Sequence, residues 1–391
     1  MKKQLWFPAA AAALAAGFLL SQAIGEPPPG DPLAGITAAE FERFRLGLED
    51  FLEVEDAEDG LGPAFNGASC AVCHSIPAIG GAGPITEVRA GLREEGGGFV
   101  ELEGGSLFHL FSIPDHRCQV QIPAEANVIA RRISIPLFGA GLVEAIPDQT
   151  LIALEDPNDS NHDGVSGRAA RVRDVATGRT RVGRFGWKAQ HATLISFAAD
   201  AYRNEMGITN DLFPEEVALG VDPKILKLCD PAPDPEDRPD PRTRLRGIDN
   251  FEAFLRLLAP LARGPIGDAV RRGEAVFVGT GCAACHIPLL ATGESPNPVF
   301  HRRPVPLYSD LLLHEVGTGD GIAQDDASPE EIRTPSLWGL RFRRPLLHDG
   351  SAATVDEAIR RHQREAVAAR DRYLHLPAED RAALARFLGS L

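Results

Sequence analysis

The 391-residue sequence predicts a mainly α-helical protein made of two related units, the first with an irregular insertion containing a few short strands. At roughly 150 residues per domain, this length allows about two domains. An internal repeat indicates two units, because the strings that begin at Phe65 and Phe277 match at an offset of 212 residues. A Pro-rich, acidic stretch separates the copies. We therefore expect a unit at 26–229, a linker at 230–245 and a second unit at 246–391.

Residues 1–25 have the pattern of an export signal. Two lysines precede an apolar run over residues 5–20, and the small residues Ala23 and Gly25 mark a cleavage site. A retained membrane anchor is the alternative, but 16 apolar residues are fewer than the ~20 that cross a bilayer. No later segment is long and apolar enough to span a membrane. We expect a mature protein that is exported, in the periplasm or beyond the cell, and soluble.

The first unit is expected to open with a helix and then to become irregular. Thr37 and Glu40 have the spacing of a capping box, and apolar residues follow at helical intervals as far as Leu52. Between about residues 85 and 185 the chain is Gly-rich with short Val, Ile and Leu runs, which predicts loops and short strands. Further helical patterns cover residues 250–258, 268–277, 354–362 and 377–388.

The charge balance argues against one class of partner. Lys and Arg number 40 against 55 Asp and Glu, which gives a formal net charge of −15. Nucleic-acid binding depends on clustered cations, so we expect no nucleic-acid partner. An acidic protein of this kind is suited to docking with a basic protein.

Two strings with the same pattern carry the strongest chemical signal. They are Cys70-x-x-Cys73-His74 and Cys282-x-x-Cys285-His286. This spacing is typical of covalent haem attachment, in which both thiols add to vinyl groups and the histidine binds the iron. One structural zinc site and two redox disulfides are the alternatives, but neither explains the histidine after each pair. We therefore predict two covalently bound haem c groups.

The other two cysteines, Cys118 and Cys229, are an even remainder in a protein expected to be exported. In an oxidising compartment such a pair favours a disulfide. Two unrelated buried thiols are the alternative.

A weaker signal is the string from Asp159 to Gly164. Asp159, Asn161 and Asp163 match the first half of a calcium loop, but Ala170 stands where an EF-hand has glutamate. A bent turn capped by its own Asp and Asn side chains is the favoured alternative to a calcium site.

Several strings together resemble the bacterial di-haem oxidoreductases, which include the di-haem cytochrome c peroxidases and MauG-type enzymes. The likeness extends from about residue 40 to 391, and part of it is to the branch labelled thiol oxidoreductase. It implies two cytochrome-c-like haem domains, of which one relays electrons and the other meets peroxide. Besides the two haem strings, it rests on residues 137–148, 183–189, 205–209, 333–339 and 347–362.

The resemblance implies a sixth iron ligand in the C-terminal unit. Peroxidases of this type place it fourteen residues after the histidine of a His-Asp-Gly string, which here begins at His348 and leads to His362. The usual ligand is methionine, and this unit contains none. The C-terminal haem is therefore expected to have two histidine ligands, His286 and His362, and a lower potential than a His/Met haem. The alternative is a solvent-facing His362 on an Arg-rich helix.

The resemblance also implies reactive residues in the first unit. Glu205 corresponds to the carboxylate that assists O–O cleavage, and Trp187 loosely corresponds to a tryptophan between the haems. The alternatives are a helix-end surface acid and a core tryptophan. The sixth position at the His74 iron is expected to be open, or to be closed by one of His109, His116, His191 and Met206.

Together these features predict a peroxidase-like oxidoreductase. A small redox protein would supply electrons through the C-terminal haem, and hydrogen peroxide or another small oxidant would react at the N-terminal haem. The alternative is a pure electron carrier with both irons six-coordinate. The two differ in ligand state, because only the enzyme requires an open iron.

Overall fold

The computed structural model describes residues 27–114, 118–229, 238–241 and 243–391. The expected export signal, His116 and most of the expected linker lie outside these residues. Within the described part, no helix combines the length and apolar character needed to cross a membrane. Helices and short strands alternate along this part of the chain, and its strands form no closed sheet.

Three helices form the core around the first haem string. They are α2 (Ala38–Leu52), α6 (Leu194–Met206) and α8 (Gly247–Leu257). The expected capping box is present at the start of α2, where Thr37 and Glu40 bond to each other. The ring of Phe254 on α8 lies 5.2 Å from Phe44 and 4.8 Å from Phe51 on α2. A helix that follows the expected linker thus completes the core of the first unit.

The close packing of α2 on α8 depends on one glycine. A Cβ atom at Gly47 would lie 2.1 Å from the carbonyl oxygen of Asn250. Any larger residue at this position would therefore separate the helices. The domain limits themselves remain a prediction. They place α8 in the second unit, although α8 packs in the core of the first.

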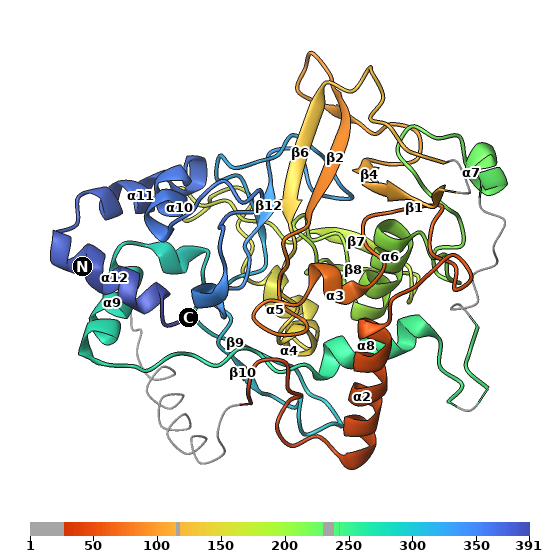
Figure 1. Cartoon of the computed structure of the whole chain (residues 1–391). Helices are drawn as coiled ribbons and strands as arrows, with labels where there is room; N and C mark the ends of the chain where they lie inside the picture. The colour runs from red at the N-terminus through yellow and green to blue at the C-terminus, as the bar shows by residue number, and fades with distance from the viewer. Residues whose placement is uncertain (1–26, 115–117, 230–237, 242) are drawn as a thin grey trace.

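The insertion contains more strand than its sequence suggested. The antiparallel pair β2 (Thr86–Arg93) and β6 (Val128–Ile133) extends at the top of Figure 1, with Thr86 opposite Ile133. This pair matters for the site because Glu87, Arg89 and Arg132 project from it. The remaining elements of the first unit are short: β1 (Ala64–Phe65), α3 (Cys70–Cys73), β3 (Phe99–Val100), β4 (Leu107–Phe108), β5 (Phe111–Ser112), α4 (Ala140–Glu144), α5 (Asp148–Ile152), β7 (Arg171–Asp174), β8 (Arg179–Val182) and α7 (Pro223–Cys229).

The C-terminal unit is built on α9 (Asp268–Gly279) and α12 (Ala378–Leu388), which pack together at the left of Figure 1. Rings of Phe277, Tyr308 and Phe387 meet between them, with centroids 5.2 to 6.0 Å apart. The smaller elements are η3 (Cys282–Ala284), β9 (Leu290–Ala291), β10 (Pro304–Val305), β11 (Leu313–His314), β12 (Ile332–Arg333), η4 (Leu340–Phe342), α10 (Val355–Arg361), η5 (Arg364–Ala366) and α11 (Val367–Leu374).

The four later helices expected from the sequence are all present, as α8, α9, α10 and α12. The internal repeat is less regular than its sequence suggests. Phe277 lies in the last turns of α9, whereas Phe65 lies in the two-residue strand β1. The repeat therefore preserves the attachment string and not the element that precedes it.

Candidate functional site

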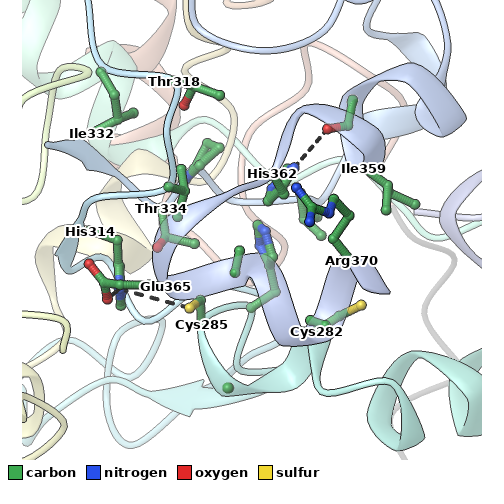
Figure 2. A pocket seen from close by; sticks show the side chains of 18 of the residues that line it. Cys282, Cys285, His314, Thr318, Ile332, Thr334, Ile359, His362, Glu365 and Arg370 are labelled. Atoms are coloured by element: carbon green, nitrogen blue, oxygen red, sulfur yellow. Dashed lines mark hydrogen bonds and ion pairs between the residues drawn. The ribbon is translucent and has the colours of Figure 1, made fainter. Parts of the chain in front are cut away.

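The C-terminal haem string opens onto a cavity of about 400 Å³ with mainly apolar walls. Cys282 and Cys285 lie on one side of it, below His362 in the view of Figure 2. His286 also lines this cavity. The structure thus brings together the residues expected from the C-terminal string and the proposed sixth ligand.

In both His286 and His362 the Nε2 atom is free. The Nδ1 atom of His286 lies 3.0 Å from the carbonyl oxygen of Tyr308, and that of His362 lies 2.7 Å from the carbonyl oxygen of Ala358. A carbonyl can only accept, so each Nδ1 carries the proton and each Nε2 keeps its lone pair for a metal. Burial, helped by the nearby His362, lowers the pKa of His286 to about 4. Burial also lowers the pKa of His362, so both rings are neutral, as iron ligation requires.

Two buried guanidinium groups test whether this cavity fits a haem. Arg333 and Arg343 line it and are 4% and 7% exposed. Within the described residues, the Arg343 side chain has no carboxylate partner, and burial lowers its pKa to about 10. A buried, unpaired cation is costly, and a porphyrin carries two carboxylates that would pair with it. The apolar walls and these cations therefore fit a haem.

The N-terminal haem string lines a second, smaller cavity of about 180 Å³. The His74 Nδ1 donates to the carbonyl oxygen of Gly81 at 2.8 Å, which again leaves Nε2 free, and burial lowers the pKa of His74. Gly81 can approach only because it has no side chain, since a Cβ there would lie 1.9 Å from the carbonyl oxygen of Ile76. A string histidine with a free Nε2 is thus found in both cavities.

Arg132 on β6 provides the corresponding test in the N-terminal cavity. Its Nε donates to Asp320 at 2.7 Å and its Nη1 donates to Gln324 at 2.7 Å. Its Nη2 is buried without a partner, although the residue lines the cavity. An orphaned donor of this kind fits an anionic group placed in the cavity, so this cavity also fits a haem.

Glu205 lies in the last turn of α6, which begins after the N-cap Thr193 and ends at Gly207 in the left-handed region. Its side chain faces the N-terminal cavity, and its Oε2 accepts a 2.9 Å hydrogen bond from the Asn66 amide. Burial, together with the nearby charge of Glu87, raises the pKa of Glu205 to about 7. It is therefore not the surface acid of the alternative interpretation.

Trp187 lines both cavities. Its Nε1 donates to the carbonyl oxygen of Ile133 at 2.8 Å, and its ring lies edge-on to His348 with centroids 6.1 Å apart. The Arg343 guanidinium lies 5.9 Å from the centre of the same ring. Trp187 is thus a core residue, as the alternative held, but one placed between the two candidate haem sites.

The structure distinguishes between the candidates for the sixth ligand of the N-terminal iron. His109 Nε2 donates to the carbonyl oxygen of Asn204 at 2.8 Å, and His191 bonds to Asp200 at 3.0 Å. Neither is among the residues that line the cavity, whereas Met206 is. Among the candidates that the structure describes, Met206 therefore remains as the candidate sixth ligand of the N-terminal iron.

The Asp159 loop forms the bent turn of the favoured alternative. Its side-chain oxygens accept backbone N–H groups: Asp159 and Asn161 from the Asp163 nitrogen at 2.9 and 2.8 Å, and Asp163 from Val165 at 2.9 Å. In the described part of the chain, three metal-ligating side chains lie close together at Cys285, Asp310 and His314, and no such group lies in this loop. Calcium binding by Asp159, Asn161 and Asp163 stays a prediction.

His314 is a buried residue of the C-terminal cavity that sequence reasoning missed. Its Nε2 bonds to Asp310 at 2.8 Å and its Nδ1 bonds to Glu365 at 2.9 Å. Although burial opposes it, these carboxylates raise the pKa of His314 well above its usual value. Both nitrogens therefore donate, and no lone pair is left for a metal. No sequence signal joins Glu365 to His314, because they are 51 positions apart.

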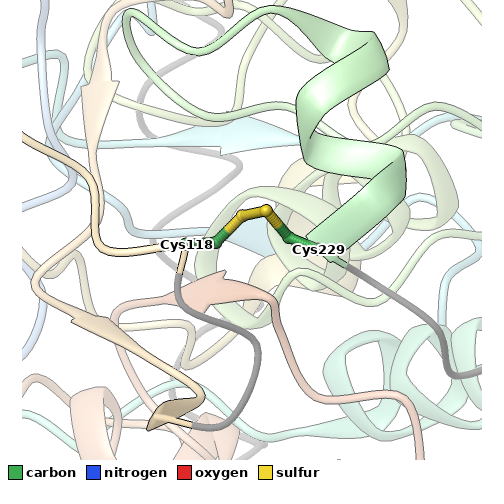
Figure 3. Close-up of a disulfide and its surroundings, with 2 residues drawn as sticks. All are labelled: Cys118 and Cys229. Atoms are coloured by element: carbon green, nitrogen blue, oxygen red, sulfur yellow. A yellow bond between two sulfur atoms is a disulfide. The ribbon is translucent and has the colours of Figure 1, made fainter.

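The last two cysteines, Cys118 and Cys229, are joined in a disulfide (Figure 3). Their Cα atoms are 5.9 Å apart and their sequence separation is 111. The bond fastens the end of α7 to the insertion, next to a small apolar cluster that includes Val120 and Leu226. It lies apart from the residues that line the two cavities.

Comparison with known families decides the relationship of this chain. The family described as "Di-haem oxidoreductase, putative peroxidase" matches residues 116–391. The chain belongs to the di-haem oxidoreductase family. The matched residues include the Cys282 string but not the Cys70 string, so the first attachment site rests on the repeat and the cavity geometry. Membership in this family supports an enzymatic, peroxidase-like role.

Solved structures show only distant likenesses to this di-haem oxidoreductase. Hydrazine synthase of Kuenenia stuttgartiensis is 14% identical, with a TM-score of 0.43 over 100% of this chain and 99% of that one. A MauG-like protein associated with microbial copper homeostasis is 18% identical, with a TM-score of 0.40 over 94% and 92%. The diheme peroxidase BthA of Burkholderia thailandensis E264 is 14% identical, with a TM-score of 0.42 over 90% and 86%. A search of curated proteins gave no match.

Proposed function

We propose that this chain is an exported di-haem c-type oxidoreductase that reduces hydrogen peroxide, or another small oxidant, at its N-terminal haem. A small redox protein would deliver electrons through the C-terminal haem. The observation that carries the proposal is the asymmetry of the two cavities. One contains a second histidine, His362, with a free Nε2, and the other contains the carboxyl of Glu205. The export signal expected at residues 1–25 would direct the protein out of the cytoplasm.

In this proposal each haem is attached by its two cysteines and held by its proximal histidine. His362 supplies the sixth ligand in the C-terminal cavity, and Arg132 and Arg343 meet the porphyrin carboxylates. When bound, haem supplies an iron that changes oxidation state and, where one face is open, a position at which an oxidant binds.

Glu205 would move the proton that O–O cleavage requires. A carboxylate can take the proton from one oxygen of hydrogen peroxide and deliver it to the departing oxygen, which leaves as water. Two electrons and two protons convert the peroxide to two waters. The Asn66 amide fixes the orientation of the carboxyl group through its 2.9 Å hydrogen bond.

Trp187 would link the two centres. Its ring lines both cavities and is fixed through the bond from Nε1 to Ile133. An aromatic side chain in this position offers a route for single electrons from the C-terminal to the N-terminal haem.

One observation favours the second candidate function, a pure electron carrier. Met206 is among the residues that line the N-terminal cavity, and methionine is an established sixth ligand of haem c. If Met206 closed the iron in every redox state, both haems would be six-coordinate and only electron transfer would remain.

The first expected result concerns the cofactor. The denatured, matured protein should carry two haem additions by mass spectrometry, because both attachment strings line cavities that fit a haem. Changing Cys70 and Cys73 to alanine should remove one addition, and changing Cys282 and Cys285 should remove the other. A mature protein without covalent haem, or with haem released by acid and acetone, would contradict the proposal.

The second expected result separates the two functions. The reduced protein should be oxidised rapidly by hydrogen peroxide and should bind one carbon monoxide per chain, because the N-terminal iron is open. Stopped-flow absorption and a carbon monoxide titration measure both. If the reduced protein ignores peroxide and binds no carbon monoxide, the electron-carrier function is correct instead.

A further inference from the structure

The chain segment that follows His362 contains the short helix η5 and is fastened to two other parts of the chain. His362 is the C-cap of the seven-residue helix α10, so helical hydrogen bonds hold it from the N-terminal side alone. The next residue, Gln363, is extended, and Arg364 has a φ of 50°. Contacts made after the helix must therefore fix the position of the His362 ring from the other side.

Glu365 supplies most of these contacts. Its Oε2 accepts hydrogen bonds from His314 Nδ1 at 2.9 Å and from the Ser166 backbone nitrogen at 2.8 Å. Its Oε1 accepts from the Glu315 backbone nitrogen at 2.6 Å. One carboxylate thus receives three donors from two segments that are distant in sequence. Two backbone hydrogen bonds join the same strip, from Gln363 to Val316 at 2.9 Å and from Glu365 to Glu315 at 3.3 Å.

The donor His314 is itself immobilised. Its other nitrogen bonds to Asp310 at 2.8 Å, and the Asp310 backbone nitrogen donates to the carbonyl oxygen of Cys285 at 2.9 Å. A Cβ at Gly167 would lie 2.3 Å from the His314 ring, so the ring packs directly on the backbone there. The position of Glu365 is therefore set by the second haem-attachment string and by the insertion of the first unit.

We propose that Glu365 is a positioning residue that holds His362 at the C-terminal iron and ties it to the insertion of the first unit at Ser166. This inference rests on the proposed ligation by His362. Without the carboxylate, Ser166, His314 and Glu315 lose an acceptor. The 363–366 segment is then fastened by the two backbone hydrogen bonds and by an exposed ion pair between Arg364 and Glu315 at 3.4 Å. His362 then leaves the iron more often, because the end of α10 is no longer held from both sides.

The test compares Glu365→Ala with two reference variants. Glu357→Ala is the matched control, because Glu357 is an exposed acid on α10 whose carboxylate also accepts a backbone N–H, from Ala353 at 2.7 Å, but does not touch the 363–366 segment. His362→Gly defines the signal of a fully opened C-terminal iron. The readouts are carbon monoxide bound per chain in the reduced protein and the rate of its binding to the C-terminal haem.

In His362→Gly, one more carbon monoxide per chain should bind than in the wild type. In Glu365→Ala the rate of binding to the C-terminal haem should rise ~10-fold or more, as expected when hydrogen bonds to a charged acceptor are lost. Glu365→Gln retains the length and an acceptor for Glu315, so it should fall between Glu365→Ala and the wild type. Glu357→Ala should match the wild type.

Two results would overturn the proposal and are distinguishable. If His362→Gly opens the iron but neither Glu365→Ala nor Glu365→Gln changes the binding rate, Glu365 does not position the ligand, although His362 is one. If His362→Gly binds no additional carbon monoxide, the ligation itself is wrong and the role of Glu365 fails with it. Glu365→Gln keeps the test decisive if the alanine variant does not fold.

Discussion

Replacing His362 with glycine should convert the C-terminal haem from a low-spin iron with two axial histidines to a high-spin iron with one. The expected effect is large, because His362 lines the same cavity as His286 and has a free Nε2, whereas both nitrogens of His314 in that cavity are bonded to carboxylates. Ferric absorption spectra and electron paramagnetic resonance measure the change. The N-terminal haem, in a separate cavity, should keep its spectrum.

His375 provides the matched control. Its Nδ1 bonds to the carbonyl oxygen of Asp371, four residues earlier, at 2.7 Å, just as His362 bonds to Ala358. His375 is exposed and lies outside the cavity of His286. His375→Gly should therefore leave both haem spectra unchanged. An unchanged spectrum in His362→Gly would leave His362 as a helix-end residue without a ligand role.

Changing Glu205 to glutamine should slow the oxidation of the reduced protein by peroxide ~10²-fold or more, the usual cost of losing a general acid or base. Glutamine keeps the shape and can still accept the Asn66 hydrogen bond, so both haem spectra should be nearly intact. Stopped-flow mixing of reduced protein with hydrogen peroxide isolates this step. Equal rates in the two proteins would remove Glu205 from the mechanism.

The pH dependence of the same step gives an independent signature. The pKa of Glu205 is about 7, raised by burial and by the charge of Glu87. The proton-accepting form is the carboxylate, so the rate should rise with pH through about 7 in the wild type and lose this rise in Glu205→Gln. Glu87→Gln removes the second cause and should shift the midpoint to lower pH. A midpoint that stays in place would show that Glu87 does not act on Glu205.

The residues that line the two candidate haem sites could be named in part from the sequence, because each Cys-x-x-Cys-His string is a short stretch of sequence. The capping box at Thr37 and the limits of α9 and α12 follow from local patterns in the same way. The disulfide followed from the even number of cysteines that remained once the haem strings were assigned. Glu205 and Trp187 could be placed by resemblance, but their meeting at one cavity needed the structure.

Other parts of the site depend on contacts that no local pattern records. Arg132 lies on a strand of an insertion that reads as irregular, and its partner Asp320 is 188 positions away. His314 is one histidine among eleven, and only the fold brings Asp310 and Glu365 to its two nitrogens. The packing of α8 on α2 was likewise hidden, because an apolar helical face does not say which helix it will meet.

The packing of α8 on α2 also constrains the order in which the protein can fold. Asp50 accepts a 2.7 Å hydrogen bond from Asn250, a residue 200 positions later in the chain. The apolar face of α2, with Phe44 and Phe51, therefore has no partner on α8 until synthesis has passed Leu257. Contacts of such long sequence separation form slowly and leave apolar surface exposed meanwhile. The newly made chain must be kept from aggregating until its second half arrives.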